Sequence, residues 1–211
     1  MPSWQILIPT IEHRHEKLRT LLDALAPQIV PGVGVLVYRD NLEDCLGTKR
    51  QRLLEASTAD YVSFLDDDDE IVPNHVALIC EALKERPDYV GWRLRVSFDG
   101  VEGKQAFHSL RYPAWSEDAH GYYRHITHKN QIRRDLALLA RYDTAVPWRG
   151  DEDYHYCAAL HETGAVKSEV FIDEVVETYR VNTKDGGATG REPLTEHQPL
   201  LEYDFVRYIS P

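Results

Sequence analysis

The sequence contains little of what marks several large classes of protein. Its three cysteines, Cys45, Cys80 and Cys157, are scattered and have no metal-binding spacing, which fits a reducing cytoplasm. The longest apolar runs are only as long as a strand, so no transmembrane segment is expected. The N-terminus MPSWQILIPT lacks the basic start and long apolar region of a signal peptide. We therefore expect a cytoplasmic protein.

Positive charge is also scarce. The chain has 24 Lys and Arg against 35 Asp and Glu, a net charge of −11. This argues against a protein that coats nucleic acid, although it leaves room for a local basic patch. Internal repeats and low-complexity tracts are absent. With 211 residues and 43% hydrophobic content, the chain can build a real core, and we expect a single domain over residues 1–211.

Segments with strand and helix patterns alternate along the chain. The expected strands are 5–10, 33–38 and 61–65, and the expected helices are 15–25, 48–56, 74–84, 132–141 and 154–160. Strands that alternate with helices predict an α/β fold whose central, mostly parallel sheet is flanked by helices. In such sheets, ligands bind beyond the carboxyl ends of the strands.

An acidic run, FLDDDDE at residues 64–70, follows the third expected strand. Carboxylates this close repel one another unless a cation offsets their charge. One interpretation is a solvated loop whose last acids favour the dipole of the next helix. The other is Mg²⁺ or Mn²⁺ held by one or two carboxylates and completed by substrate phosphates. We favour the metal with a nucleotide diphosphate, because the strand delivers the first aspartates to the ligand edge. An EF-hand is excluded by the missing ligand spacing, glycine and glutamate.

Four segments in order, ILIPT, VLVYRD, KRQRLLEASTADYVSFLDDDDE and WRGDEDYHYCAAL, together resemble the family 2 type of glycosyltransferase with a GT-A fold. The resemblance covers roughly residues 5–182. It implies a Rossmann-like GT-A domain with a nucleotide-sugar half at about 1–103 and an acceptor and catalytic half at about 104–182. A flexible loop and C-terminal tail would follow at 183–211.

The resemblance implies a nucleotide pocket at the ends of the first two strands. In the family, a strand-ending Pro-Thr segment and the following acid line this pocket, and here these are Pro9, Thr10 and Glu12, with Arg14 nearby. The aspartate after the second strand, here Asp40, is expected to contact the base.

The resemblance also implies a basic pair and a metal site. Lys49 and Arg50 match the family's basic pair close to the nucleotide. The DxD motif maps to Asp66 and Asp68, with Asp68 the better ligand for Mn²⁺ or Mg²⁺ and Asp66 nearer the ribose. Asp67 could substitute for either, because a run of four aspartates leaves the register open.

Glu152 and Asp153 resemble the family's acidic pair, whose aspartate is the general base. An inverting transfer needs a carboxylate that accepts the proton of the acceptor hydroxyl, while the metal stabilises the departing diphosphate. Asp153 is the expected base, and Glu152 orients the acceptor or is the reserve candidate. An acidic helix start is the alternative interpretation, and both can hold at once.

The match weakens near the C-terminus. Many family members place a metal-binding histidine after a Tyr-Arg pair, whereas here Asn182 follows Tyr179-Arg180-Val181. Asn182 or water would complete the metal shell. Lys184 or Arg191, in a glycine-containing loop, would neutralise the diphosphate on closure, or the loop is a plain connection.

Residues 104–134 interleave basic residues with aromatics and histidines. This pattern suits an anionic, stackable acceptor such as nucleic acid, and suits a sugar phosphate or lipid-linked sugar equally. We expect His125 and His128 beside the acceptor or bonded to the backbone, with Trp148 and Arg149 also on the acceptor side. A zinc site at His120, His125 and His128 lacks cysteines and a fourth ligand.

We therefore expect a metal-dependent, inverting glycosyltransferase that moves a sugar from a nucleotide diphosphate sugar, with UDP favoured by the resemblance. The acceptor would be a hydroxyl of a saccharide or of a hydroxymethylated nucleobase in DNA. A nucleotidyltransferase is the first alternative, but residues 9–19 lack the glycine-rich basic loop of that class. A catalytically inactive sugar-nucleotide-binding protein is the second, and the two acidic motifs argue against it. The sequence indicates neither the donor sugar nor the oligomeric state.

Overall fold

The computed structural model describes residues 1–142, 151–181 and 206–209. Its strands are β1 (Trp4–Ile11), β2 (Val33–Asp40), β3 (Tyr61–Phe64), β4 (Glu70–Ile71), β5 (Tyr89–Phe98), β6 (Val101–His108), β7 (Ser116–Glu117), β8 (Gly121–Arg124), β9 (Ile132–Arg133), β10 (Glu169–Val181) and β11 (Val206–Ile209). Its α-helices are α1 (His15–Leu25), α2 (Leu46–Ala56), α3 (His75–Leu83), α4 (Arg134–Ala137) and α5 (Glu152–Glu162), and two 3-10 helices are η1 (Glu12–Arg14) and η2 (Ala26–Gln28).

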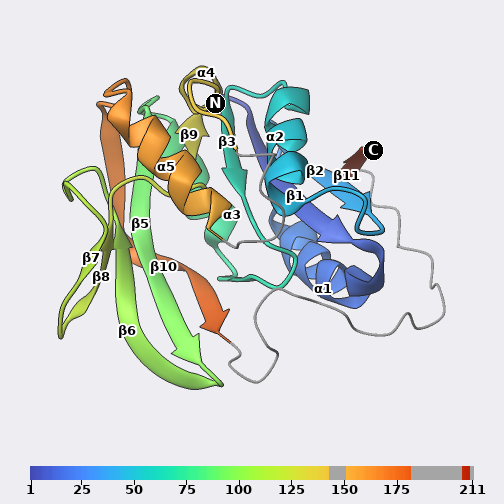
Figure 1. Cartoon of the computed structure of the whole chain (residues 1–211), viewed down its shortest axis with the longest axis horizontal. Coiled ribbons are helices and arrows are strands. Elements are labelled where there is room, and N and C mark those ends of the chain that lie inside the picture. The colour runs from blue at the N-terminus through green and yellow to red at the C-terminus, as the bar shows by residue number, and fades with distance from the viewer. Residues whose placement is uncertain (143–150, 182–205, 210–211) are drawn as a thin grey trace.

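These strands form one mixed sheet with helices on its faces (Figure 1). The order is β11-β2-β1-β3-β9-β5-β6-β8-β7, with β10 beside β5 and β4 beside β10. The strands β11, β2, β1 and β3 are parallel, while β9, β6 and β7 pair antiparallel with neighbours. The predicted α/β class, with a mostly parallel central sheet, is confirmed. None of the described helices combines the length and apolarity needed to cross a bilayer.

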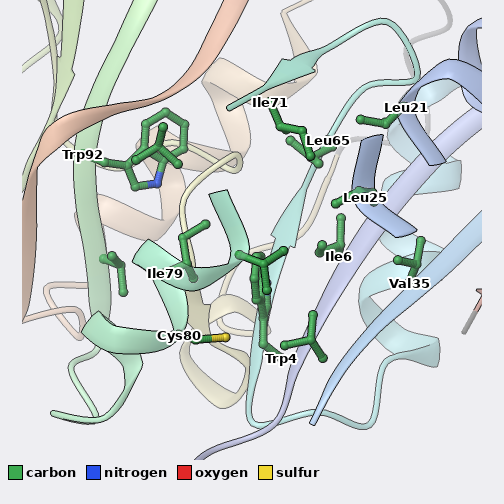
Figure 2. Packing of buried hydrophobic residues seen from close by; sticks show 14 of the residues in the cluster. Trp4, Ile6, Leu21, Leu25, Val35, Leu65, Ile71, Ile79, Cys80 and Trp92 are labelled. Carbon is green, nitrogen blue, oxygen red and sulfur yellow. The ribbon is translucent and has the colours of Figure 1, made fainter. Parts of the chain in front are cut away.

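Side chains on the two faces of the central strands pack into two separate hydrophobic cores. On β1, Trp4, Ile6 and Ile8 enter one core, whereas Leu7 enters the other. The first core contains the buried leucines of α1 and the apolar face of α3, and Figure 2 shows Trp4 and Trp92 among its members. The second core lies under α2, α4 and α5. The predicted helix over residues 15–25 and its leucine stripe are confirmed.

Two segments differ from the sequence prediction. The helix predicted over 132–141 is wrong: Ile132 and Arg133 form β9, which pairs with β3, and only Arg134–Ala137 is helical. The pairing of Ile132 in the sheet outweighs the local helical pattern, and Leu139 is left exposed. Near the C-terminus, Val206–Ile209 forms β11 beside β2, where a tail was expected.

His75 at the start of α3 is a buried, neutral histidine. It is 1% exposed, and its Nδ1–H donates to the carbonyl oxygen of Val176 at 3.0 Å. Burial lowers the pKa of His75 to about 4. In the unfolded chain His75 is protonated below its ordinary pKa of about 6.5, whereas in the folded protein it stays neutral down to about pH 4. The contribution of the neutral, buried His75 to stability is therefore present above about pH 6.5 and is lost as the pH falls towards about 4.

We expect His75→Asn to weaken the acid sensitivity of the fold. Between about pH 7.5 and about pH 5.5, the wild type should lose roughly 1 kcal/mol more unfolding free energy than the variant, because the variant has one buried imidazole fewer to protonate on unfolding. Urea denaturation at both pH values measures the difference. His120→Asn, at an exposed position, is the matched control. Equal acid sensitivity in the wild type and His75→Asn would contradict the prediction.

Candidate active site

Parallel pairing brings the predicted nucleotide-binding residues to one edge of the sheet. Thr10 of β1 lies beside Arg39 of β2, and the next residue of β1 lies beside Asp40. On the other side of β1, β3 ends just before the acidic run. Pro9 is buried in β1, and Glu12 begins η1 directly after this strand. The carboxyl ends of β1, β2 and β3 therefore lie side by side at one edge of the sheet.

Asp40 and Lys49 tie the ends of β1 and β2 together. The side chain of Asp40 has no exposed surface, and it accepts hydrogen bonds from Lys49 Nζ and from the backbone nitrogen of Asp44 at 2.8 Å. Lys49 Nζ also donates to the carbonyl oxygen of Thr10 at 3.0 Å. Burial lowers the pKa of Lys49, and Asp40 opposes this shift. The carboxylate of Asp40 is thus bound within the protein, and its contact with a base stays a prediction.

The four aspartates of the acidic run have four different surroundings. Asp67 is 3% exposed, and it accepts from Thr10 Oγ1 at 2.5 Å and from Arg14 Nε at 2.8 Å. Burial raises the pKa of Asp67 to about 6, against the effect of Arg14. Asp68 is about half exposed and pairs through Oδ2 with Arg14 at 2.6 Å and with Lys17 at 3.6 Å. Asp68 is therefore the accessible member, whereas Asp67 anchors the loop.

Asp66 is joined to the second acidic motif by one arginine. Arg50 Nη2 lies 2.8 Å from Asp66 Oδ1, and Arg50 Nη1 lies 2.6 Å from Glu152 Oε1. Burial acts to raise the pKa of Asp66, but Arg50 and then Lys129 outweigh it, and the pKa lies below its ordinary value. Burial raises the pKa of Glu152, with Arg50 opposing. The two motifs therefore belong to one site.

Asp69 is held in the interior by residues that the sequence reasoning missed. Lys129 Nζ binds Asp69 and also lies 2.8 Å from Glu177 Oε1. All three side chains are at most 9% exposed, and Asp69 Oδ2 also accepts from the backbone nitrogen of Asp66 at 2.7 Å. Burial and then the neighbouring Glu177 raise the pKa of Asp69 well above its ordinary value. The sequence does not single out Glu177, because β10 also contains Glu169, Asp173 and Glu174.

Asp153 lies in the first turn of α5, beside His128. Its side chain is 31% exposed, and its Oδ2 is 3.7 Å from Nδ1 of His128. His125 is bonded to the backbone, one of its two predicted roles: its Nδ1 accepts from the backbone nitrogen of Ile126 at 2.6 Å, and its ring stacks on that of His161, with centroids 4.1 Å apart. His128 is therefore the histidine that faces the predicted base.

The predicted acceptor region keeps only part of its basic character. Lys129 is buried between Asp69 and Glu177, and Arg133 pairs with Asp88 and Asp135. Arg124 lies over the ring of Trp115 at 4.8 Å, and this ring is 5.1 Å from that of Tyr154. Tyr154 follows the predicted base directly and is 45% exposed. Sequence reasoning missed this aromatic pair, because residues 115 and 154 are distant along the chain.

Several predicted residues lie outside the described part of the chain. They are Trp148, Arg149, Asn182, Lys184 and Arg191.

Asp66 and Asp68 are the predicted ligands of the metal. Within residues 1–142, 151–181 and 206–209, no group of three or more His, Cys, Asp or Glu side chains is arranged to hold a metal ion. Asp66 pairs through Oδ1 with Arg50, and Asp68 pairs through Oδ2 with Arg14 and Lys17. Mg²⁺ is commonly held by one or two carboxylates plus substrate phosphates. Asp66 and Asp68 therefore fit a metal that binds together with a diphosphate, and they do not form a closed site.

Solved structures of TarS from S. aureus share the fold. A TarS fragment, residues 1–349, has a TM-score of 0.62 at 16% identity, and the match covers 84% of this chain and 60% of that chain. The same fragment in complex with UDP-GlcNAc has a TM-score of 0.59 at 16% identity, covering 92% and 60%. At this identity the likeness shows the GT-A fold, and the chain spans about 60% of the TarS fragment. A search among curated proteins gave no match.

The sequence also matches a family model. The model described as glycosyl transferase family 2 matches residues 16–139, which is more than half of the 211 residues. The matched range includes Lys49, Arg50, the acidic run and His128, and it ends before α5. The chain belongs to glycosyl transferase family 2.

Proposed function

We propose that this protein is an inverting glycosyltransferase that moves a sugar from a UDP-sugar to a hydroxyl of a saccharide acceptor. The observation that carries the proposal is the Arg50 bridge, because it places Asp66 of the acidic run and Glu152 of the second motif in one site. TarS structures with UDP and with UDP-GlcNAc support the donor class.

The donor would lie beyond the ends of β1 and β2. Arg14 and Lys17 pair with Asp68 and are partly exposed there, and their positive charge would contribute to binding a diphosphate together with the metal. Asp66 and Asp68 would hold Mg²⁺ or Mn²⁺, which supplies charge stabilisation to the departing diphosphate. Arg50 stays buried and keeps Asp66 ionised. The role of these residues is to bind the donor and to fix its orientation.

Asp153 would be the general base. It accepts the proton of the acceptor hydroxyl while the hydroxyl oxygen bonds to the anomeric carbon, and the nucleoside diphosphate leaves with the electron pair of the broken bond. Glu152 forms an ion pair with Arg50. Asp153 is partly exposed and lies at a helix N-terminus, where a carboxylate is favoured. This difference supports Asp153 as the base and Glu152 as the residue that orients Arg50.

A saccharide acceptor is favoured over nucleic acid, because basic residues of the predicted acceptor region form ion pairs within the protein. Lys129 and Arg133 pair with carboxylates of the protein itself, and the chain carries a net charge of −11. The exposed ring of Tyr154, braced by Trp115, lies one residue from Asp153 and suits the apolar face of a sugar ring. Arg124, whose guanidinium lies over the ring of Trp115, would accommodate an anionic group of the acceptor.

A thermal-shift panel tests the donor. UDP, GDP, CDP, ADP and dTDP are each added with and without Mn²⁺, and UDP with Mn²⁺ should give the largest rise in Tm. A ligand at about 100 times its Kd stabilises a protein by roughly 2.7 kcal/mol, which such a panel detects. Asp68→Asn is the matched control: its side chain is about half exposed, so the fold should survive while the metal-dependent part of the shift is lost. No shift with any diphosphate would contradict the proposed function.

A further inference from the structure

His128 is a buried histidine with no hydrogen-bond partner, in the middle of the proposed site. It is 5% exposed, and neither ring nitrogen has a partner among the described residues. Burial, and then the nearby Arg50, lower the pKa of His128 well below its ordinary value. The ring is therefore neutral, with one nitrogen as donor and the other as acceptor. Leaving such a buried group unpaired is unfavourable, because it has lost its hydrogen bonds to water. A buried polar group without a hydrogen bond would gain stability from a partner close by.

Phe64 contacts both the backbone and the ring of His128. Its carbonyl oxygen accepts from the backbone nitrogen of Phe64, the last residue of β3, at 2.9 Å. Its ring also packs against the ring of Phe64, with centroids 5.9 Å apart. On the other side, Nδ1 lies 3.7 Å from Oδ2 of Asp153. This separation exceeds the usual hydrogen-bond range of about 2.7–3.2 Å by less than about 1 Å.

We propose that His128 is the positioning residue for Asp153: its Nδ1–H donates to Oδ2 and aims the carboxylate at the acceptor hydroxyl. The role rests on the proposed function, in which Asp153 is the base. Hydrogen bonds of catalytic groups are often long in the free enzyme and shorten when substrates bind. His128 keeps its proton throughout, and the proton of the acceptor goes to the carboxylate of Asp153. The sequence predicted His128 beside the acceptor or bonded to the backbone, whereas its ring faces the proposed base.

Three substitutions separate this role from simple packing. His128→Asn places an amide N–H near the position of Nδ1, His128→Gln extends its amide towards the position of Nε2, and His128→Phe keeps a ring without a donor. We expect Gln and Phe to lower kcat by up to about 100-fold, the effect of misplacing a reacting group by about 1 Å. The KM for the donor and the UDP-Mn²⁺ thermal shift should stay unchanged. His128→Asn should retain at least about tenfold more activity than His128→Gln.

Two outcomes of the kinetics would overturn the positioning role. Equal losses in Asn, Gln and Phe would indicate packing alone, and a lost donor shift together with lost kcat would indicate contact with the donor. NMR of ¹⁵N-histidine-labelled protein tests the same contact without turnover. We expect a neutral His128 ring protonated on Nδ1, whose Nδ1 resonance moves in Asp153→Ala. A neutral ring with its proton on Nε2 would overturn the positioning role. If the protein showed neither turnover nor a donor-dependent thermal shift but kept the Nδ1 proton and its response to Asp153→Ala, only the proposed function would be contradicted.

Discussion

Replacing Asp153 with asparagine is expected to lower kcat by about 10²–10⁴-fold while leaving donor binding intact. The amide has the shape of the carboxylate but cannot accept the proton of the acceptor hydroxyl. The fold should tolerate the change, because Asp153 is 31% exposed and the ion pairs of Arg50 go to Asp66 and Glu152. The backbone nitrogen of Tyr154 donates to Asp153 Oδ1 at 2.8 Å, and the asparagine oxygen can still accept this bond. Steady-state kinetics with the thermal shift of UDP and Mn²⁺ measure both parts.

Glu152→Gln is the matched comparison on the neighbouring residue. It removes the charge bound to Arg50, which is 3% exposed, so we expect a lower Tm and a weaker donor shift in addition to any loss of kcat. The two isosteric changes should therefore give different patterns. If Asp153→Asn kept kcat within about tenfold of the wild type while Glu152→Gln abolished turnover with an unchanged donor shift, Glu152 would be the base.

The site could be located from the sequence, but the roles within it could not be assigned. An apolar strand followed by FLDDDDE predicted where the carboxylates would gather, and parallel pairing explains why they do. The separate roles of the four aspartates depend on partners far along the chain. Arg14 binds Asp67 across 53 positions, and Lys129 binds Asp69 across 60. No local pattern specifies such pairs, so the sequence left the register of the DxD motif open.

The segment from 125 to 134 shows the same limit in another form. The basic residues and histidines of 104–134 predicted an acceptor surface, and the apolar pattern of 132–141 predicted a helix. Both interpretations count residues without their partners. In the structure, Ile132 pairs with Val62 in the sheet, and Lys129 turns inward. Tertiary pairing outweighed the helical pattern, and two distant carboxylates outweighed the preference of lysine for solvent. The aromatic pair of Trp115 and Tyr154 was missed for the same reason.

Lys129→Met is expected to lower the free energy of unfolding by about 3–5 kcal/mol. Although burial opposes its charge, Asp69 and then Glu177 raise the pKa of Lys129 well above its ordinary value. Methionine matches the length of the aliphatic chain but leaves two buried carboxylates without their cation. Such uncompensated charges destabilise a fold far more than the loss of an exposed ion pair, which is worth about 0–1 kcal/mol. Urea denaturation near neutral pH measures the loss.

A triple variant separates the charge from the packing. Asp69→Asn and Glu177→Gln combined with Lys129→Met remove all three charges at similar volume, and we expect most of the lost stability to return, because a neutral cluster carries no uncompensated charge. Lys84→Met is the surface control: it removes an exposed pair with Glu81 and should change the unfolding free energy by less than about 1 kcal/mol. A triple variant no more stable than Lys129→Met would contradict the charge argument. The fourth aspartate of the run would then owe its burial to packing rather than to its cation.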